Sequence, residues 1–178
     1  TSSAHQTQPP ASLQAPSDRA TRPSIVGEDS GPTPPFPIYL AGTVQRGFGR
    51  GGKDLGCPTA NLPSKLLQPA VDEHKGSGSA AEQPSLSPID TRVHPMVMSL
   101  GWNPFYANKT KTAEVHIMHP FKRDFYGLQI QVIVLGYIRP EYNYVDVEAL
   151  KNDIETDKQV ANRSLERATY SSFASDSF

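Results

Sequence analysis

Residues 112–138 read TAEVHIMHPFKRDFYGLQIQVIVLGYI and contain the two clearest strand patterns of the chain. In 112–119 apolar and polar residues alternate, and this period of two places alternate side chains on opposite faces of a strand. Glu114 and His116 fall on the polar face. The run 128–138 is the longest strand candidate, and Arg139-Pro140 ends it. The centre of the fold is therefore predicted to be β-sheet.

The elements on either side extend this prediction. Residues 38–45 read as a strand that ends at a glycine cluster, and 95–102 as another that the turn signal Asn103-Pro104 closes. Beyond residue 146, apolar residues recur at helical spacing, with Asp146 as a candidate N-cap. Several strands followed by one terminal helix, without βαβ alternation, predict an antiparallel barrel or sandwich.

Composition limits the classes of protein. The chain has 178 residues, a formal net charge of −1 and 1 Cys. This length suits one domain with tails. A near-zero charge provides no basic field for nucleic acid or anionic membranes. One cysteine excludes an intrachain disulfide framework and a multi-cysteine metal site. No run approaches the roughly 18 apolar residues of a spanning helix, so we expect a soluble chain.

The distribution of aromatic residues predicts the domain organisation. The 7 Phe, 7 Tyr and 1 Trp are all absent from 1–35 and from 64–95. Segments without aromatic or β-branched runs bury too little apolar surface to offset the entropy of ordering. We therefore expect a disordered Pro/Ser-rich tail at 1–35, a folded domain at 36–168 with an atypical flexible loop at 64–92, and a C-terminal tail at 169–178.

The glycine cluster lies in 42–61, which reads GTVQRGFGRGGKDLGCPTAN. Its spacings match the dinucleotide-binding fingerprint and most of a P-loop, but both motifs need a helix immediately afterwards. Asp54 follows Lys53 where a P-loop has Ser or Thr, and the stretch 55–58 cannot start an amphipathic helix cleanly. A glycine-rich hairpin connection and a phosphate-binding loop of another kind remain.

The chemistry of this segment favours phosphate. Its glycines let backbone N–H groups approach an anion closely, and Arg46, Arg50 and Lys53 add cationic donors. Thr59 and Asn61 lie two residues apart, so in a strand their two neutral oxygens would face one side and suit a hard cation such as Mg²⁺. The alternative is that both residues are turn formers with local hydrogen bonds.

Glu114 is the candidate general base, because phosphoryl transfer needs one acceptor for the proton of the attacking alcohol. The alternative is a solvated strand glutamate. His116 and His119 make a poor zinc pair, since they fall on opposite faces of the strand, and we expect them to be structural.

Taken together, these segments resemble a known family, the riboflavin kinases (flavokinases), and within it the eukaryotic, monofunctional type. The resemblance covers about 36–63 and 95–168 in order. Its motifs are Gly-x-Val-x-x-Gly-x-Gly-Arg-Gly-x-Lys-x-Leu-Gly-x-Pro-Thr-Ala-Asn at 42–61, MVMSLGWNPFY at 96–106, KTAEVHIMH at 111–119, FKRDFYG at 121–127 and GYIRPE at 136–141.

The resemblance implies a six-stranded antiparallel Greek-key barrel with a C-terminal helix. It implies transfer of the ATP γ-phosphate to the ribityl 5′-hydroxyl of riboflavin, which gives FMN and ADP and is the first step of FMN and FAD biosynthesis. The divalent metal would be Mg²⁺, with Zn²⁺ or Mn²⁺ as alternatives. We expect a monomer in the cytoplasm, with the mitochondrion as the alternative compartment.

The resemblance also assigns roles to residues. Glu114 matches the catalytic base. Thr59 and Asn61 would hold the metal, and Arg139 and Glu141 would lie on the flavin side of the cleft, although a strand-terminating ion pair explains the last two equally well. The nucleotide-binding positions are Gly47, Gly49, Arg50, Gly51, Lys53, Gly56 and Pro58.

One segment departs from the family pattern. The family carries an extra strand of the form Gly-Val-Tyr-Tyr-Gly-Trp-Ala before 95–102, whereas 64–92 has comparable length and no such motif. Either another segment replaces this strand, or the coding boundaries of the sequence are misassigned. The alternative function is a catalytically impaired flavin- or nucleotide-binding barrel. A third class, an OB-like nucleic-acid module, is disfavoured by the charge of −1.

Overall fold

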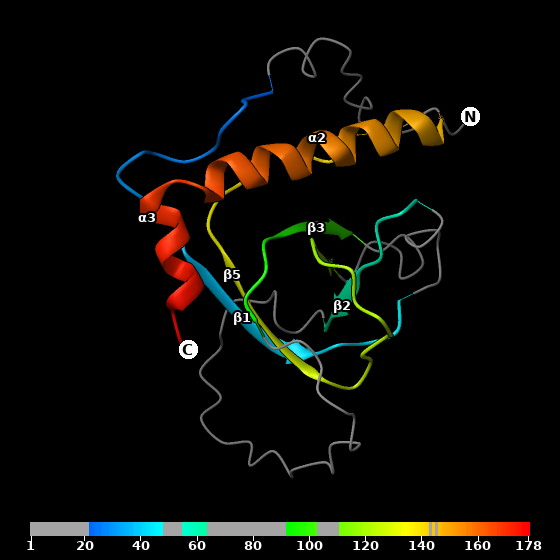
Figure 1. Cartoon of the computed structure of the whole chain (residues 1–178). Helices are drawn as coiled ribbons and strands as arrows, with labels where there is room; N and C mark the ends of the chain where they lie inside the picture. The colour runs from blue at the N-terminus through cyan, green and yellow to red at the C-terminus, as the bar shows by residue number, and fades with distance from the viewer. Residues whose placement is uncertain (1–21, 48–54, 64–91, 103–110, 143, 145) are drawn as a thin grey trace, which may run out of the picture.

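The computed structural model describes residues 22–47, 55–63, 92–102, 111–142, 144 and 146–178 (Figure 1). Within these residues the strands come first and the helices last, as the sequence predicts. The elements are β1 (Ile38–Thr43), β2 (Ala60–Leu62), β3 (Met96–Trp102), β4 (Lys111–Ile117), β5 (Gln129–Val134), α2 (Val147–Leu165), α3 (Ala168–Ser171) and the short 3₁₀ helix η3 (Ser172–Ser175).

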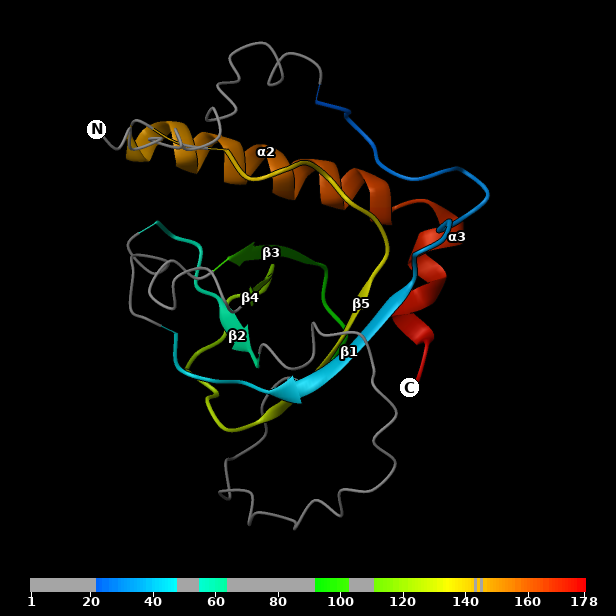
Figure 2. The ribbon, with the colours of Figure 1, turned by 180° about the vertical axis from the view of Figure 1, so that it is seen from behind.

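The five strands form two antiparallel sheets. One pairs β1 with β5, and the other has the order β2-β4-β3. Figures 1 and 2 show β1 and β5 running together past the three-stranded sheet, with α2 on the far side of β3. The fold is therefore dominated by antiparallel sheet with C-terminal helices. The strands of the described residues do not close into one barrel, and most of the segment expected to lack a family strand, 64–91, lies outside them.

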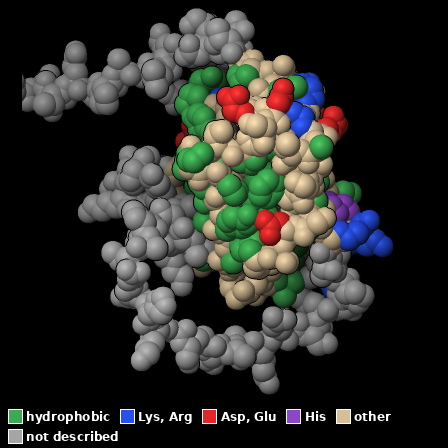
Figure 3. All heavy atoms as spheres, turned by 90° about the vertical axis from the view of Figure 1, so that its left-hand side faces the viewer, with side chains coloured by type: hydrophobic (Ala, Val, Ile, Leu, Met, Phe, Trp, Pro, Cys, Tyr) green, Lys and Arg blue, Asp and Glu red, His purple; other side chains and the backbone are tan. Residues whose placement is uncertain are grey.

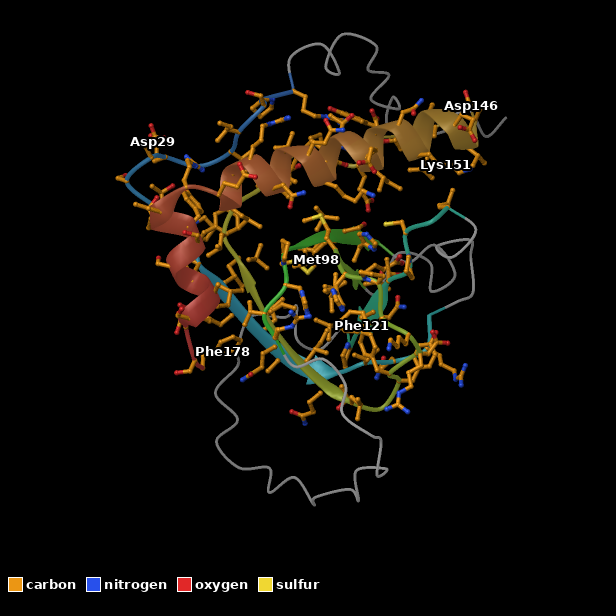
Figure 4. The ribbon with its side chains drawn as sticks, in the orientation of Figure 1. Asp29, Met98, Phe121, Asp146, Lys151 and Phe178 are labelled. Carbon is orange, nitrogen blue, oxygen red and sulfur yellow. The ribbon has the colours of Figure 1, made fainter. Side chains whose placement is uncertain are left out.

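The core lies between the two sheets. Ala113 and Val115 of β4 are 0% exposed, and Ala60 of β2 pairs directly with Val115. Met98 of β3 pairs with Val115 from the other side and packs on the same cluster, and Figure 4 shows it in the interior. This burial confirms the predicted alternation from Ala113 to Val115, whereas His116, expected on the polar face, is buried as well. The buried members are Val44, Ala60, Leu62, Ala113, Val115 and Val132.

The fourth predicted strand is shorter than its apolar run. The sequence pattern extends over 128–138, but β5 ends at Val134, which pairs with Ile38 at the start of β1. Pro37 precedes Ile38 and has no N–H group to continue the ladder. The residues after Val134 continue toward α2 without a partner strand among the described residues.

The helix α2 begins where the sequence predicts. The Asp146 side chain accepts a hydrogen bond from the backbone N–H of Ala149 at 2.7 Å, which satisfies one of the free donors of the first turn. Figure 4 shows Asp146 and Lys151 at this end of the helix, away from α3. Toward its C-terminal end the helix buries Val160, Ala161 and Ser164. No helix in the described part of the chain is long and apolar enough to cross a membrane.

Specific contacts hold both ends of the described chain, and the expected N-terminal tail falls mostly on 1–21, outside the described residues. Residues 22–31 run along α2 to α3 (Figures 1 and 2), and they are held there by hydrogen bonds and ion pairs rather than by aromatic burial. At the other end Tyr170 of α3 is 2% exposed. Aromatic content does not register the polar contacts that hold residues 22–31, because it measures only the apolar surface that a segment can bury.

The C-terminal residues pack on β1. The Tyr39 hydroxyl donates to the Asp176 carboxylate at 2.8 Å, and the Tyr39 and Phe178 rings meet edge to face with centroids 4.8 Å apart. The hydrogen bond to Asp176 is the main reason why the pKa of Tyr39 is raised. Figure 3 views this end of the molecule and shows hydrophobic side chains at its surface. Ile38, Tyr39 and Phe178 remain partly exposed there.

Candidate active site

A row of polar side chains crosses the three-stranded sheet. Glu114 in the middle strand β4 lies directly opposite Asn61 of β2 on one side and Ser99 of β3 on the other. Directly opposed residues of antiparallel strands share a face, with Cβ atoms about 5 Å apart. We call Asn61, Glu114 and Ser99 the polar row. It occupies the face opposite to the core, because the neighbouring positions in each strand are the apolar ones.

A second carboxylate reaches this row from the segment after β5. The Ser99 hydroxyl donates to Oε1 of Glu141 at 2.7 Å. The same carboxylate lies over Gly101, where an added Cβ would be 2.8 Å from Oε1. Ser99 and Gly101 are two residues apart and therefore face the same side of β3. Glu141 thus lies beside Glu114, at the β3 edge of the polar row.

Arg139 does not pair with Glu141. Its guanidinium binds Asp157 of α2, with Nε 3.0 Å from both carboxylate oxygens and Nη2 2.7 Å from Oδ2. Burial lowers the pKa of Arg139, but the hydrogen bonds and charge of Asp157 raise it, and the net shift is upward. The segment after β5 is therefore joined to α2 by the Arg139–Asp157 ion pair. Of the two predicted flavin-side residues, only Glu141 reaches the polar row.

The glycine-rich segment enters at the opposite edge of the row. The backbone N–H of Gln45 donates to the carbonyl of Asn61 at 2.8 Å. Gly47 then passes so close to Asn61 that an added Cβ would lie 2.5 Å from Nδ2 and 3.1 Å from Oδ1. A side chain at position 47 would therefore displace this amide. The next predicted nucleotide positions, Gly49, Arg50, Gly51 and Lys53, lie outside the described residues.

The stretch between the glycines and β2 is also close to the row. Thr59 is half-buried and comes immediately before β2, two residues ahead of Asn61. The carbonyl of Pro58 accepts a hydrogen bond from Nδ1 of buried His116 at 2.8 Å. His116 therefore holds the backbone that carries Thr59, which is the structural role expected for it. The exposed Gly56 begins this stretch with a φ of +68°.

The thiol of Cys57 is affected by charged groups of both the polar row and α2. Burial raises the pKa of its thiol, the charge of Lys158 lowers it, and the charges of Glu114 and Glu155 raise it. A thiol that responds to all three groups lies within electrostatic range of each.

The histidines that the structure describes form no metal centre with neighbouring acids. His119 lies outside β4 and stacks on His94, with ring centroids 4.0 Å apart, next to Phe121; Figure 4 labels Phe121 below the sheet. Among the described residues no group of three or more His, Cys, Asp and Glu side chains is arranged to hold a metal ion. Arg46 stacks on Tyr126 with its guanidinium carbon 4.5 Å from the ring centroid, at the entrance of the glycine-rich segment.

Sequence reasoning missed Ser99 and Gly101. Both look like ordinary strand residues, and their importance depends on which residue of β4 each one opposes. No sequence signal gives that register, because it depends on the chain between the two strands. The part played by Asp157 was missed for the same reason.

The site combines a carboxylate, neutral oxygen donors and a glycine-rich entrance with basic residues. A carboxylate can accept the proton of an alcohol, neutral oxygens suit a hard cation, and glycines with basic residues suit phosphate. Such a site, on an antiparallel sheet, defines a phosphotransferase that acts on an alcohol.

Known proteins narrow this class to one family. A family model described as riboflavin kinase (Flavokinase) matches residues 34–165. Riboflavin kinase of Pyricularia oryzae is 47% identical, with 84% of this chain and 81% of the relative covered. Those of Aspergillus terreus (44%; 84% and 84%) and Aspergillus fumigatus (40%; 85% and 87%) are similar over the same extent. The chain belongs to the riboflavin kinase family, in its fungal form.

Proposed function

We propose that this chain transfers the γ-phosphate of ATP to the ribityl 5′-hydroxyl of riboflavin, forming FMN and ADP in the first step of FMN and FAD biosynthesis. The single observation that carries the proposal is the register of β2, β4 and β3. It places the Glu114 carboxylate between Asn61, which lies against the glycine-rich segment, and Ser99, which binds Glu141.

Glu114 is the proposed catalytic base. Its side chain is half-buried on the face opposite to the core, while its neighbours Ala113 and Val115 are fully buried. The backbone of β4 is thus fixed by packing on one face, and the carboxylate on the other face has a defined position. A base positioned in this way can take the proton of the 5′-hydroxyl as the oxygen attacks phosphorus.

Thr59 and Asn61 are the proposed ligands of the divalent cation. Their hydroxyl and amide oxygens are hard donors, and Gly47 leaves beside Asn61 a space that any Cβ would fill. When bound, the cation would neutralise charge on the phosphates that are being transferred. The oxygen donors favour Mg²⁺, with Mn²⁺ or Zn²⁺ as alternatives. Two protein ligands suffice, because Mg²⁺ keeps several waters and takes further ligands from phosphate.

The two edges of the polar row would receive the two substrates. The β2 edge carries Gly47, and the stretch with Gly56 and Pro58 leads into it, so the nucleotide phosphates belong there. Gly49, Arg50, Gly51 and Lys53, which lie outside the described residues, are proposed as further phosphate contacts. At the β3 edge Glu141 is proposed to face riboflavin directly, and Arg139 to support that wall through Asp157.

Three finer expectations complete the proposal. The whole chain would close a six-stranded Greek-key barrel around the two described sheets. It would act as a monomer. It would work in the cytoplasm, with the mitochondrion as the alternative, and without nucleic-acid or membrane partners.

The test is to incubate the purified full chain with riboflavin, ATP and Mg²⁺ and to separate FMN from riboflavin by chromatography. We expect FMN and ADP in equal amounts and no FMN when EDTA is added. A folded sample that binds riboflavin and releases no FMN would overturn the proposal in favour of a binding-only barrel. The same assay with Mn²⁺ or Zn²⁺ in place of Mg²⁺ decides which cation supports the reaction.

A further inference from the structure

A strap of the N-terminal segment joins the two C-terminal helices. We call residues 22–31 the N-terminal strap. Its contacts with α2 and α3 are polar: the backbone N–H of Val26 donates to the Ser164 hydroxyl at 3.0 Å, and the Tyr170 hydroxyl donates to the carbonyl of Glu28 at 3.0 Å. Arg167 binds the Asp29 carboxylate at 3.0 Å, and Figure 4 shows Asp29 where the strap meets α3.

The backbone of the strap has a conformation that favours glycine at position 27. Gly27 has a φ of +80°, which is accessible to glycine at no steric cost, and an added Cβ would lie 2.1 Å from the Tyr170 hydroxyl oxygen. The exposed Arg163 of α2 also donates from Nε to the carbonyl of Ser24 at 2.9 Å. The strap is thus fitted to the helices at several points.

Arg22 is the one strap residue whose charged side chain is buried. Its side chain is 6% exposed and lies between Asp153 and Asp157, one helical turn apart on α2. Nη2 is 3.1 Å from Oδ1 of Asp153 and Nη1 is 3.4 Å from Oδ1 of Asp157, while Nη1 also donates to the backbone carbonyl of Asp153 at 3.3 Å. A charge at this depth depends on its two carboxylate partners.

Asp157 is shared between two arginines. Oδ1 lies 3.4 Å from Nη1 of Arg22 and also accepts from Nε of Arg139 at 3.0 Å, and Oδ2 accepts from Nη2 of Arg139 at 2.7 Å. Asp157 is 16% exposed and Arg139 is 13% exposed, so the group is screened only weakly by water. The strap is therefore connected through one carboxylate to the segment that follows β5.

That segment leads directly to the polar row. Arg139 also donates from Nη1 to the carbonyl of Pro140 at 2.9 Å and stacks on Tyr142, 4.8 Å from the ring centroid. These contacts fix the backbone on both sides of Glu141, whose carboxylate binds Ser99 opposite Glu114. Contacts thus run from Arg22 through Asp157 to Arg139 and the Pro140 carbonyl. The next residue, Glu141, binds Ser99, which is the strand partner of the candidate base.

We propose that Arg22 and Asp157 are positioning residues for riboflavin phosphorylation, and that they hold Arg139 so that Glu141 stays against Ser99 beside Glu114. This inference rests on the proposed function. It concerns the β3 edge of the polar row only, because the glycine-rich segment meets the row at β2, on the other side of β4. The strap would therefore affect the riboflavin side of the site and leave the nucleotide side unchanged.

The test compares Arg22→Ala with Arg163→Ala in the full chain. Both side chains contact α2 or the strap, but Arg163 is exposed and reaches only the strap carbonyl of Ser24. For Arg22→Ala we expect kcat/KM for riboflavin to fall about tenfold, as for a lost interaction of positioning strength, with KM for ATP changed less than twofold. For Arg163→Ala both constants should stay within twofold of the parent.

Two further variants separate positioning from general loosening. Asp157→Asn should reproduce the Arg22→Ala loss, and the double variant should lose little more than either single one, because both remove the same connection. Arg22→Lys, which keeps the charge without the fork of donors, should recover part of the loss. Thermal unfolding of every variant verifies that the assayed sample is folded.

The outcomes separate the inference from the proposed function. If the parent chain forms no FMN, the proposed function fails and the inference fails with it. If the parent is active, the inference is overturned when folded Arg22→Ala keeps the parent kcat/KM for riboflavin. It is overturned equally when Arg163→Ala loses as much, or when KM for ATP rises in step with that for riboflavin.

Discussion

The two faces of the three-stranded sheet are formed by adjacent positions of the same strands, yet one face is apolar and the other is polar. On one face Ala60, Val115 and Met98 stand side by side and pack into the core. On the other face Asn61 and Glu114 stand in the same order with Ser99. Because the faces alternate along each strand, each residue of the polar row is flanked by residues that fix the backbone by packing. One short strand can thus contribute both to the core and to the candidate site.

This arrangement has one strict requirement, which is the register itself. A slip of one residue between β2 and β4 would bring Asn61 opposite an apolar side chain and turn polar groups toward the core. Substitutions of residues on each face, and of residues that belong to neither face, test how far the two faces can be separated.

The largest effect is expected for Glu114→Gln on the polar face. The amide keeps the shape of the side chain and cannot accept the 5′-hydroxyl proton, so kcat should fall by about 10²- to 10⁴-fold. The midpoint of thermal unfolding should stay within a few degrees of the parent, because the face is not the core. FMN formation measured by chromatography gives kcat. A variant with parental kcat would remove Glu114 from the role of base.

Val115→Ala tests the apolar face one residue away. Val115 is 0% exposed, and loss of two methyl groups from a closed core should lower the free energy of unfolding by about 2 kcal/mol. Chemical denaturation measures this change. At a temperature where the variant is folded, kcat should remain within a few-fold of the parent. A loss of activity as large as that of Glu114→Gln would show that the two faces are not separable.

Gly47→Ala tests the close approach between the glycine-rich segment and the polar row. The new Cβ would overlap the Asn61 amide, which must move away from its position beside Glu114. We expect the Mg²⁺ concentration for half-maximal activity to rise about tenfold, which corresponds to about 1.4 kcal/mol. An activity titration with Mg²⁺ measures it. Unfolding should be unaffected, since Gly47 is exposed, and an unchanged Mg²⁺ requirement would separate Asn61 from the metal.

The smallest effect is expected outside both faces, for Tyr144→Phe. The Tyr144 hydroxyl donates to Asp153 at 2.8 Å. Burial, and then this hydrogen bond, raise the pKa of Tyr144 from 10.0 to about 12. The folded state therefore holds the proton more firmly than the unfolded state, so the stabilisation is complete below pH 10 and is lost as pH rises toward 12.

At neutral pH the parent should be more stable than Tyr144→Phe by about 1 kcal/mol, the usual contribution of one hydrogen bond in a partly exposed pair. The difference should shrink above pH 10 and be lost before pH 12. Other tyrosines titrate in both proteins and cancel in this comparison. Chemical denaturation at pH 7 and at alkaline pH gives the two differences, and an equal gap at every pH would contradict the assigned cause.

A feature could be predicted from the sequence when it depends on residues that are close together in the sequence. The alternation around Glu114 and the Asp146 cap depend on neighbouring residues, and the structure confirms both. The family resemblance, confirmed by the matched relatives, adds the reaction. The pairing of Ser99 with Glu114 and of Arg139 with Asp157 could not be predicted, because each joins residues whose proximity depends on the whole fold. A charged Arg22 in a proline-rich stretch looks like solvent-exposed chain until its two aspartates are in place.

The shared Asp157 carboxylate also has a consequence for the order of assembly. Asp153 lies 131 residues after Arg22 in the sequence, and Asp157 lies four residues further on. During synthesis Arg22 therefore leaves the ribosome long before either aspartate. Closing so long a loop is costly in entropy and slow compared with local pairing. The sheets can form while the strap is still open. We therefore expect the strap to be among the last described segments to close during synthesis, and its closure to complete the Arg139–Asp157 cluster beside the candidate site.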